Sequence, residues 1–262
     1  MADSEEKEKD YVENETMYGD YLINSVLGES KVSIVFLVED MSTFEKKVLK
    51  RIAIRDDNIE KIEREINIMR ALNGCPYTLH LIDAFIQDNY YCIITPYYPN
   101  GCMCDIIPYY GGRMIPEDTV RCVIHQVLLA LQYMHGLGYC HRDIKPDNIL
   151  VVNWNEVNPK VLLCDFGFAT KLSDGERSED FCGTLDYAAP EIYLQHPYDN
   201  SVDMWSLGVT IHYLLFQQYP LPEYNVDRSQ LRLMLYRKKL ILYRFNQYHY
   251  NEALNLFEQL CS

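Results

Sequence analysis

Two short stretches of the chain concentrate side chains that can transfer a phosphoryl group. HRDIKPDN, residues 141–148, supplies an Asp, a Lys two residues later and an Asn five residues after the Asp, and DFG, residues 165–167, adds a second Asp. In phosphoryl transfer to a hydroxyl group, a carboxylate orients the hydroxyl and accepts its proton, an ammonium offsets phosphoryl charge, and oxygen ligands hold magnesium on the phosphates. The two stretches therefore indicate this chemistry.

The elements that must position these side chains follow from the apolar pattern. From Tyr21 to Ile94 apolar residues alternate or form short runs, which predicts a strand-rich region interrupted by one helix, IEKIEREINIMRALN. PYYPNG, residues 96–101, is a linker punctuated by Pro and Gly. After it, an amphipathic helix is predicted over 117–137, and the apolar segment SVDMWSLGVTIHYLLF predicts a buried helix. The sequence predicts a small β-rich lobe and a larger α-rich lobe.

The motifs, taken in order, resemble those of the eukaryotic protein kinases. They are VLK at 48–50, Glu65, HRDIKPDN, DFG, GTLDYAAPE at 183–191 and DMWSLG at 203–208. The resemblance runs from about residue 19 to the C-terminus, and it implies the α+β, bilobal protein-kinase fold. The expected parts are an acidic disordered tail (1–18), a β-rich N-lobe with one regulatory helix (19–96), a hinge linker (97–101) and an α-rich, C-terminally shortened C-lobe (102–262).

The resemblance implies roles for the residues of the two opening stretches. Asp143 is the expected catalytic base, and Lys145 is expected beside the γ-phosphate of ATP. Asn148 and Asp165 are expected to bind Mg²⁺. ATP and Mg²⁺ are thus the implied cofactors.

The resemblance also implies an ATP site in the N-lobe. Lys50 is expected to grip the α- and β-phosphates and to pair with Glu65, since a lone Lys in an apolar cleft would pay a desolvation penalty. Thr95 holds the gatekeeper position before the linker that binds adenine. The other expected ATP contacts are Leu27, Gly28, Glu29, Ser30, Lys31, Val32, Ser33, Ile34 and Val35 of the phosphate loop, with Val48 and Leu150 against the adenine ring.

The phosphate loop LGESKVSIV has the spacing of a GxGxxG loop, but serines replace its second and third glycines. Glycine serves such loops because bare backbone N–H groups can approach phosphate oxygens. Taken alone, the stretch also fits an ordinary strand edge with a Gly turn. In the context of the kinase motifs we expect a loop that covers ATP with a stiffer lid and weaker affinity.

Two motifs bear on the acceptor and on activation. HRDIK together with GTLDY is the serine/threonine pattern of the family, and Thr184 is expected to hydrogen-bond near Asp143. Arg142 is expected to pair with negative charge on the activation segment, where Asp180 stands at the position that related kinases phosphorylate. Our hypothesis is that Asp180 supplies part of that charge permanently; the alternatives are a merely acidic, solvated loop and phosphorylation of Ser178.

One residue lacks the partner that the resemblance implies. The family pairs the Glu of its APE motif, here Glu191, with a later Arg, and no Arg follows Arg244. Either Glu191 is satisfied otherwise, or the base of the C-lobe is less stable than in relatives.

Composition limits the range of partners. The chain has 24 basic and 38 acidic residues, a net charge of −14, which argues against general affinity for nucleic acid or anionic lipid and fits basic protein substrates. Nine cysteines without a CxxC pair, and histidines without metal-ligand spacing, predict free thiols and no structural metal. No signal peptide or 18-residue apolar run occurs, so a location in the cytoplasm or nucleus is expected. A monomer is also expected.

The sequence therefore predicts an ATP-dependent protein kinase that phosphorylates Ser and Thr hydroxyls of protein substrates. The main alternative is a pseudokinase or scaffold that keeps the fold with weak or no catalysis, and it is motivated by the altered phosphate loop. Kinases of small molecules form a third class, but they lack the GTxxY and APE substrate platform that this chain carries.

Overall fold

The computed structural model of the protein describes residues 16–30, 32–173 and 175–220. The chain forms two compact units. The N-terminal unit combines the chain up to Asn73 with Leu79–Tyr97, and the C-terminal unit combines Gly74–Thr78 with the chain from Tyr98 onward. Residues 1–15 of the predicted acidic tail and residues 221–262 lie outside the described residues.

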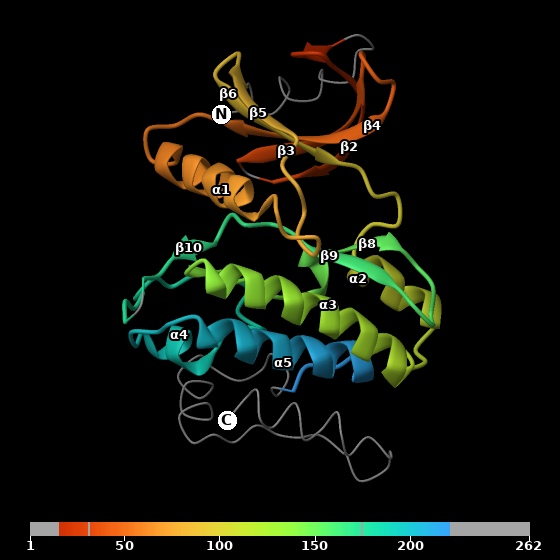
Figure 1. Cartoon of the computed structure of the whole chain (residues 1–262), viewed down its shortest axis with the longest axis vertical. Helices are drawn as coiled ribbons and strands as arrows, with labels where there is room; N and C mark the ends of the chain where they lie inside the picture. The colour runs from red at the N-terminus through yellow and green to blue at the C-terminus, as the bar shows by residue number, and fades with distance from the viewer. Residues whose placement is uncertain (1–15, 31, 174, 221–262) are drawn as a thin grey trace, which may run out of the picture. The chain divides into compact units, whose positions relative to one another are not determined.

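The N-terminal unit is built on a six-stranded sheet in the order β1-β2-β3-β4-β6-β5, with every neighbouring pair antiparallel (Figure 1). Alternation along the strands creates the core. In β3, for example, Phe36 and Val38 are completely buried while their neighbours are partly exposed. The strands are β1 (Met17–Tyr18), β2 (Tyr21–Glu29), β3 (Ser33–Asp40), β4 (Lys46–Ala53), β5 (Asp83–Gln87) and β6 (Tyr90–Pro96).

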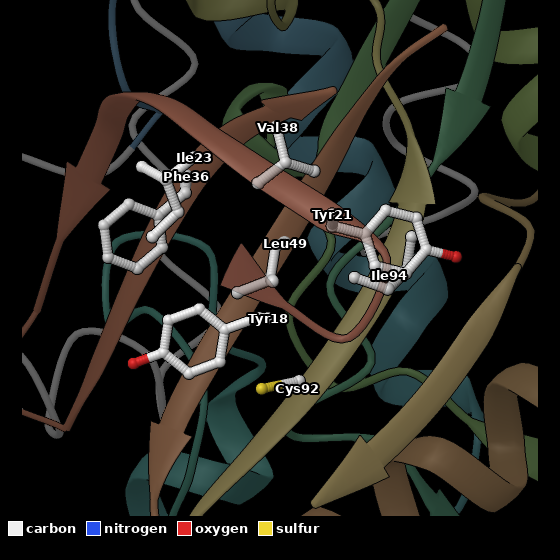
Figure 2. Packing of buried hydrophobic residues seen from close by; sticks show 8 residues of the cluster. All are labelled: Tyr18, Tyr21, Ile23, Phe36, Val38, Leu49, Cys92 and Ile94. Carbon is white, nitrogen blue, oxygen red and sulfur yellow. The ribbon is translucent and has the colours of Figure 1, made fainter. Parts of the chain in front are cut away.

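Figure 2 shows the apolar cluster that holds this sheet together. Its members lie on five of the strands, β1, β2, β3, β4 and β6. They are Tyr18, Tyr21, Ile23, Phe36, Val38, Leu49, Cys92 and Ile94. Helix α1 (Ile59–Leu72) is the predicted helix of this unit. It buries Ile62, Ile66, Met69 and Leu72, as its 3.6-residue apolar spacing predicted.

The C-terminal unit is mainly helical, and α3 (Glu117–Gly136) packs against α5 (Ser201–Phe216) (Figure 1). Helix α5 is buried along nearly its whole length, which explains why its sequence is apolar all round. Two short antiparallel sheets, β7 with β10 and β8 with β9, complete the unit. The remaining elements are α2 (Met103–Ile106), the 3₁₀ helices η2 (Ile107–Tyr110) and η3 (Pro146–Asn148), β7 (Tyr139–Cys140), β8 (Ile149–Asn153), β9 (Lys160–Leu163), β10 (Thr170–Lys171) and α4 (Pro190–Leu194).

The segment Gly74–Thr78 belongs to the C-terminal unit, although the expected N-lobe of 19–96 includes it. The reason is backbone pairing. Leu163 donates its N–H to the Tyr77 carbonyl at 2.9 Å, and Thr78 forms a parallel bridge with Leu163.

The predicted α+β class, with a β-rich first part and a helical second part, is confirmed. Across the described ranges, no helix is both long enough and apolar enough to cross a bilayer.

Candidate active site

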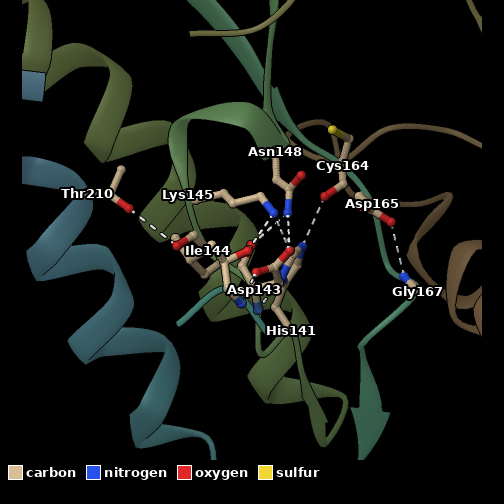
Figure 3. Close-up of polar contacts among 10 residues, drawn as sticks. His141, Asp143, Ile144, Lys145, Asn148, Cys164, Asp165, Gly167 and Thr210 are labelled. Carbon is tan, nitrogen blue, oxygen red and sulfur yellow. Dashed lines mark hydrogen bonds and ion pairs between the residues drawn. The ribbon is translucent and has the colours of Figure 1, made fainter. Parts of the chain in front are cut away.

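Two short sheets bring the stretches HRDIKPDN and DFG together in the C-terminal unit. Residues 141–148, called the catalytic loop below because they carry the predicted catalytic residues, lie between β7 and β8, and DFG lies between β9 and β10. Because β7 pairs with β10 and β8 pairs with β9, both ends of the two stretches are held side by side. His141 Nε2 contacts the Cys164 carbonyl at 3.0 Å, and Cys164 donates its N–H to the Asn148 carbonyl at 2.9 Å (Figure 3).

Asp143 is the most enclosed carboxylate of the catalytic loop, with 2% of its surface exposed. Its Oδ1 accepts the N–H of Thr184 at 2.8 Å, and its Oδ2 accepts Lys145 Nζ at 2.8 Å and Asn148 Nδ2 at 3.0 Å. Burial alone would raise the pKa of Asp143, but the hydrogen bonds from Lys145 and Thr184 outweigh it and the pKa is lowered. The side chain is therefore an oriented carboxylate anion at neutral pH.

Lys145 connects the catalytic loop to Thr184, the residue that the resemblance placed near Asp143. Besides contacting Asp143, its Nζ donates to Thr184 Oγ1 at 2.7 Å. The ammonium thus stands next to the carboxylate and next to the segment that carries the GTLDY motif. A positive charge fixed there can offset charge that develops on a transferring phosphoryl group.

The predicted metal ligands present oxygen atoms. Asn148 donates from Nδ2 to the Asp143 carbonyl at 2.7 Å as well as to its carboxylate, so the amide is oriented and Oδ1 accepts no hydrogen bond from the described residues. Asp165 is exposed and follows β9 in a left-handed conformation with φ 59°. Amide and carboxylate oxygens are the donors that Mg²⁺ prefers, with its other positions filled by phosphate and water. The two residues fit magnesium on these grounds.

Arg142 pairs with the activation segment at the predicted position. Its Nη1 donates to Asp180 Oδ2 at 2.8 Å, to Ser178 Oγ at 3.1 Å and to Tyr198 Oη at 3.1 Å. Its Nε donates to the Phe168 carbonyl at 2.7 Å. A guanidinium with 4% of its side chain exposed therefore connects the residue beside Asp143 to the segment after DFG and to the 178–180 stretch.

Gly183 is required by the backbone of this region. It has φ +86°, and a Cβ at this position would lie 2.4 Å from the carbonyl oxygen of Arg142. Arg142 itself has φ 69°, which is unusual for a residue with a side chain. The close approach of the two backbones allows the next residue, Thr184, to donate its N–H to Asp143.

The sequence predicted no role for Asp203, the first residue of the DMWSLG motif. The structure shows that Asp203, completely buried in α5, accepts the N–H of His141 at 2.9 Å, the N–H of Arg142 at 2.7 Å and His135 Nε2 at 2.8 Å. Burial alone would raise the pKa of Asp203, but the His135 hydrogen bond and the nearby imidazoles outweigh it, and the pKa is lowered. A carboxylate inside a wholly apolar helix was the available signal.

The N-terminal unit contains the predicted ion pair. Lys50 Nζ, on β4, lies 2.7 Å from Glu65 Oε1 on α1. Thr95 is buried on β6 directly opposite Val48 of β4, and Val35 of β3 is opposite Lys50. Leu150, the other predicted adenine contact, belongs to the C-terminal unit, on β8.

The phosphate loop joins β2 to β3. Leu27, Gly28 and Glu29 end β2, and Ser33, Ile34 and Val35 begin β3. Lys31 lies outside the described residues. The nucleotide contacts predicted for the phosphate loop therefore come from two adjacent antiparallel strands and the turn between them.

Within this turn the Ser30 hydroxyl bonds to its own loop. Ser30 Oγ accepts the N–H of Ser33 at 3.0 Å and that of Val32 at 3.4 Å, and it lies 2.9 Å from Ser33 Oγ. A glycine at residue 30 would leave these two N–H groups available to an anion.

Glu191, on α4, has no hydrogen bond or ion pair through its carboxylate to any described residue. The arginines that follow Glu191 in the chain, Arg228, Arg232, Arg237 and Arg244, lie outside the described residues.

An anionic buried carboxylate and a neighbouring ammonium in one loop, with the oxygen atoms of Asn148 in that loop and of Asp165 in the adjacent DFG segment, define a phosphotransferase site. The comparisons with known proteins agree with this class: the family model described as the protein kinase domain matches residues 21–262. The chain belongs to the protein kinase family, which confirms the resemblance found in the sequence.

Individual relatives are moderately similar to this chain. A protein of Acanthamoeba polyphaga mimivirus, named as a serine/threonine-protein kinase, is 32% identical over 84% of this chain and 54% of its own length. An Aurora kinase of Yarrowia lipolytica is 33% identical over 78% of this chain and 54% of its own length. Calcium/calmodulin-dependent protein kinase type 1 of Caenorhabditis elegans is 33% identical over 83% of this chain and 62% of its own length. The chain spans about half the length of the curated relatives it matches.

Proposed function

We propose that this protein transfers the γ-phosphoryl group of ATP, in the presence of Mg²⁺, to Ser and Thr hydroxyls of protein substrates. The observation that carries the proposal is the setting of Asp143, whose carboxylate is buried, anionic and oriented by Thr184, Lys145 and Asn148. The names of two relatives support the same acceptor class, since both are called serine/threonine-protein kinases.

Asp143 orients the substrate hydroxyl and receives its proton. An ionised carboxylate has about four acceptor sites, of which Thr184, Lys145 and Asn148 use three, so one can accept the hydroxyl. Because its pKa is lowered, the carboxylate is a weak base and accepts the proton late, after the oxygen has begun to bond to phosphorus. Its main contribution is therefore orientation.

The remaining residues hold charge in place. Lys145 keeps an ammonium beside Asp143, and Glu65 holds the Lys50 ammonium in one orientation in the N-terminal unit. Asn148 and Asp165 are the proposed magnesium ligands. The metal, when bound, would neutralise charge on the nucleotide phosphates.

The second candidate function is a pseudokinase or scaffold. One observation favours it: the Ser30 hydroxyl occupies N–H groups of the phosphate loop that would otherwise face an anion. Against it stands the complete set of Asp143, Lys145, Asn148 and Asp165. The chain has everything that the chemistry requires, and the loop affects how tightly nucleotide binds.

The test is phosphoryl transfer from labelled ATP with magnesium to generic basic proteins, comparing the wild type with Asp143→Asn. Loss of a positioned base typically costs about 10²–10⁴-fold in rate, so we expect a drop of that size. Asp118→Asn is the matched control because the Asp118 side chain is 91% exposed and lies at the start of α3. Equal rates for the wild type and Asp143→Asn would favour the scaffold.

A further inference from the structure

Two thiols contact each other at the start of helix α2. Cys102 immediately precedes the helix, and Cys104 lies within it. Both are free cysteines with partly exposed side chains. The Cys104 thiol donates a hydrogen bond to the sulfur of Cys102, so the two side chains point toward one another.

The backbone holds this pair at a separation that suits a disulfide. Met103, the residue between the two cysteines, is helical, and helix geometry places Cα atoms two residues apart at about 5.5 Å. Disulfides join Cα atoms that are about 4.4–6.8 Å apart. The backbone of Cys102 is fixed by a bridge to Leu150 of β8 and by its N–H, which donates to Asp105 Oδ2 at 2.8 Å. A bond between the sulfurs therefore requires rotation of side chains and little movement of the backbone.

The two thiols differ in acidity. The hydrogen bond from Cys104 lowers the pKa of Cys102, and the N–H of Asp105 adds to this effect, while burial and the Asp105 carboxylate oppose it. The same thiol–thiol hydrogen bond, burial and the carboxylate of Asp147 raise the pKa of Cys104. The thiolate is the reactive form of cysteine. Cys102 is therefore the thiol that reacts first, and Cys104 is the thiol that reacts with the product.

The pair also contacts the catalytic loop. Helix α2 lies beside β8 (Figure 1) and beside η3, and a hydrogen bond joins the Cys104 thiol to Asp147 of η3. Asp147 stands between Lys145, which donates to Asp143, and the proposed metal ligand Asn148. A sulfur in a disulfide has no proton to donate, so oxidation of Cys104 removes this contact of Asp147.

We propose that Cys102 and Cys104 are a redox pair that a hydroperoxide converts to a disulfide, and that this disulfide slows phosphoryl transfer. First, the Cys102 thiolate attacks an oxygen of the hydroperoxide and the O–O bond breaks, which leaves a sulfenic acid on Cys102 and an alkoxide or hydroxide that takes up a proton. Next, the Cys104 sulfur attacks the Cys102 sulfur, and the sulfenic hydroxyl leaves with the thiol proton as water. The two thiols lose two electrons and the hydroperoxide gains them. A dithiol reductant reverses the change by thiol–disulfide exchange.

The effect on activity rests on the proposed function, whereas formation of the disulfide does not. The experiment treats the reduced, full-length protein with hydrogen peroxide and then stops the reaction with catalase. Mass spectrometry of proteolytic fragments identifies the disulfide, and the rate of phosphoryl transfer is measured before treatment, after treatment and after addition of dithiothreitol. We expect a Cys102–Cys104 disulfide and a rate that falls at least about threefold, as the loss of one hydrogen bond that orders the loop allows. Dithiothreitol should restore the rate.

The variants assign the two roles. Cys102→Ser and Cys104→Ser each remove one partner, and Cys122→Ser is the matched control because Cys122 is also a partly exposed free thiol, on α3. Each variant is compared with its own reduced form. The wild type and Cys122→Ser should be inhibited reversibly, and the other two variants should not. A 1,3-dione probe for sulfenic acids should label residue 102 in Cys104→Ser but leave residue 104 unlabelled in Cys102→Ser.

Three results overturn the redox pair while leaving the proposed function intact: active, peroxide-treated enzyme without the disulfide, a disulfide that leaves the rate unchanged, or equal inhibition of Cys102→Ser and the wild type. If the reduced enzyme phosphorylates no protein, the proposed function fails, and amide hydrogen exchange of residues 145–149 replaces the rate. Faster exchange after oxidation in the wild type, but not in Cys102→Ser, supports the pair. Unchanged exchange, or no disulfide, overturns it.

Discussion

The hydroxyl of Ser30 holds two backbone N–H groups of the turn between β2 and β3, at 3.0 Å from Ser33 N and 3.4 Å from Val32 N. A phosphate oxygen that used these donors would have to displace the hydroxyl. Ser30→Gly should therefore lower the Michaelis constant for ATP, by about threefold to tenfold if a net hydrogen bond of roughly 1 kcal/mol is released. Initial-rate kinetics at varied ATP and saturating substrate measure it.

Ser30→Ala shows whether the hydroxyl or the Cβ of Ser30 raises the Michaelis constant for ATP. Alanine removes the hydroxyl but keeps a Cβ, so a lower Michaelis constant in both variants identifies the hydroxyl as the cause, and an effect of glycine alone identifies the Cβ. Unchanged constants in both would mean that the loop accommodates serine without cost. Ser33→Ala is the comparison. It removes the 2.9 Å contact between the two hydroxyls but keeps the hydrogen bonds that Ser30 Oγ accepts from the N–H groups of Val32 and residue 33.

At the scale of single residues, the sequence could single out Asp143, Lys145 and the Arg142–Asp180 pair, because the motifs shared with the kinase family mark their positions. It could not show the contacts of Ser30, since they depend on the conformation of the turn. Nor did it assign a role to Asp203: apolar periodicity reports which face of a helix is buried, not that a buried carboxylate accepts three hydrogen bonds there.

At the scale of elements, an ion pair between Arg142 and Asp180 connects the 178–180 stretch to the catalytic loop. Asp180 Oδ2 lies 2.8 Å from Arg142 Nη1, and the Asp180 side chain is 62% exposed while that of Arg142 is 4% exposed. We expect Asp180→Asn to lower kcat about fivefold, because a charge-assisted hydrogen bond at a half-exposed site contributes about 1 kcal/mol to ordering the segment. Steady-state kinetics and amide hydrogen exchange of residues 175–183 measure the effect.

Asp180→Glu and Glu179→Gln make that prediction specific. The first keeps a negative charge within reach of Arg142 and should retain most of the activity. The second removes a charge that forms no contact with Arg142 in the structure, so its effect should be smaller than that of Asp180→Asn. Unchanged activity together with unchanged exchange protection in Asp180→Asn would contradict the hypothesis that this carboxylate supplies activating charge.

Asp203 connects three elements of the C-terminal unit, since α5 carries the carboxylate, α3 carries His135, and the catalytic loop carries the N–H groups of His141 and Arg142. Removing the charge of a completely buried group with these partners should lower the free energy of unfolding by about 3 kcal/mol in Asp203→Asn. Urea denaturation measures it, with Asp118→Asn as an exposed control that should change little.

The pH dependence of this effect has a definite sign. The pKa of Asp203 is lower in the folded protein than its ordinary value, so the unfolded chain binds the proton more readily. The stabilisation is therefore present above the ordinary pKa of Asp, about 3.9, and is lost as the pH falls through the lower folded pKa. The difference in unfolding free energy between the wild type and Asp203→Asn should be constant near neutrality and shrink in acid. A difference that grew in acid would contradict this assignment.

Elements whose apolar residues follow a regular pattern could be predicted from the sequence. Features that depend on backbone contacts between distant segments could not. The strands of the N-terminal unit follow from alternating apolar residues. Helix α1 follows from its apolar face, and helix α5 from a run that is apolar all round. The placement of Gly74–Thr78 in the C-terminal unit depends on its backbone pairing with Leu163. No local sequence pattern predicts this pairing. The packing of Tyr219 on Tyr213 depends likewise on the left-handed conformation of Gln217, a residue type that seldom adopts it.

At the scale of the whole molecule, the two units provide stability and the net charge acts on approaching molecules. Each unit has its own apolar core, so the sheet that carries Lys50 and the helical unit that carries Asp143 are stabilised independently of the chemistry. The order of motifs along the chain could predict this division and the kinase family. The charge of −14 is different, because it belongs to the molecule as a whole and acts at long range on whatever approaches.

That charge leads to a prediction about salt. Raising the ionic strength from about 0.01 M to about 0.1 M shortens the screening length from about 30 Å to about 10 Å, so attraction from the molecule as a whole is screened while short-range contacts with bound substrate are affected less. The Michaelis constant for a peptide that carries arginine should rise severalfold over this range, and that for its citrulline counterpart should rise less. The turnover number at saturating peptide should stay the same, because bound substrate no longer depends on long-range attraction. A Michaelis constant for the arginine peptide that is independent of salt would mean that the acidic surface does not attract the substrate, and that any arginine preference arises only from the side chains in contact with it.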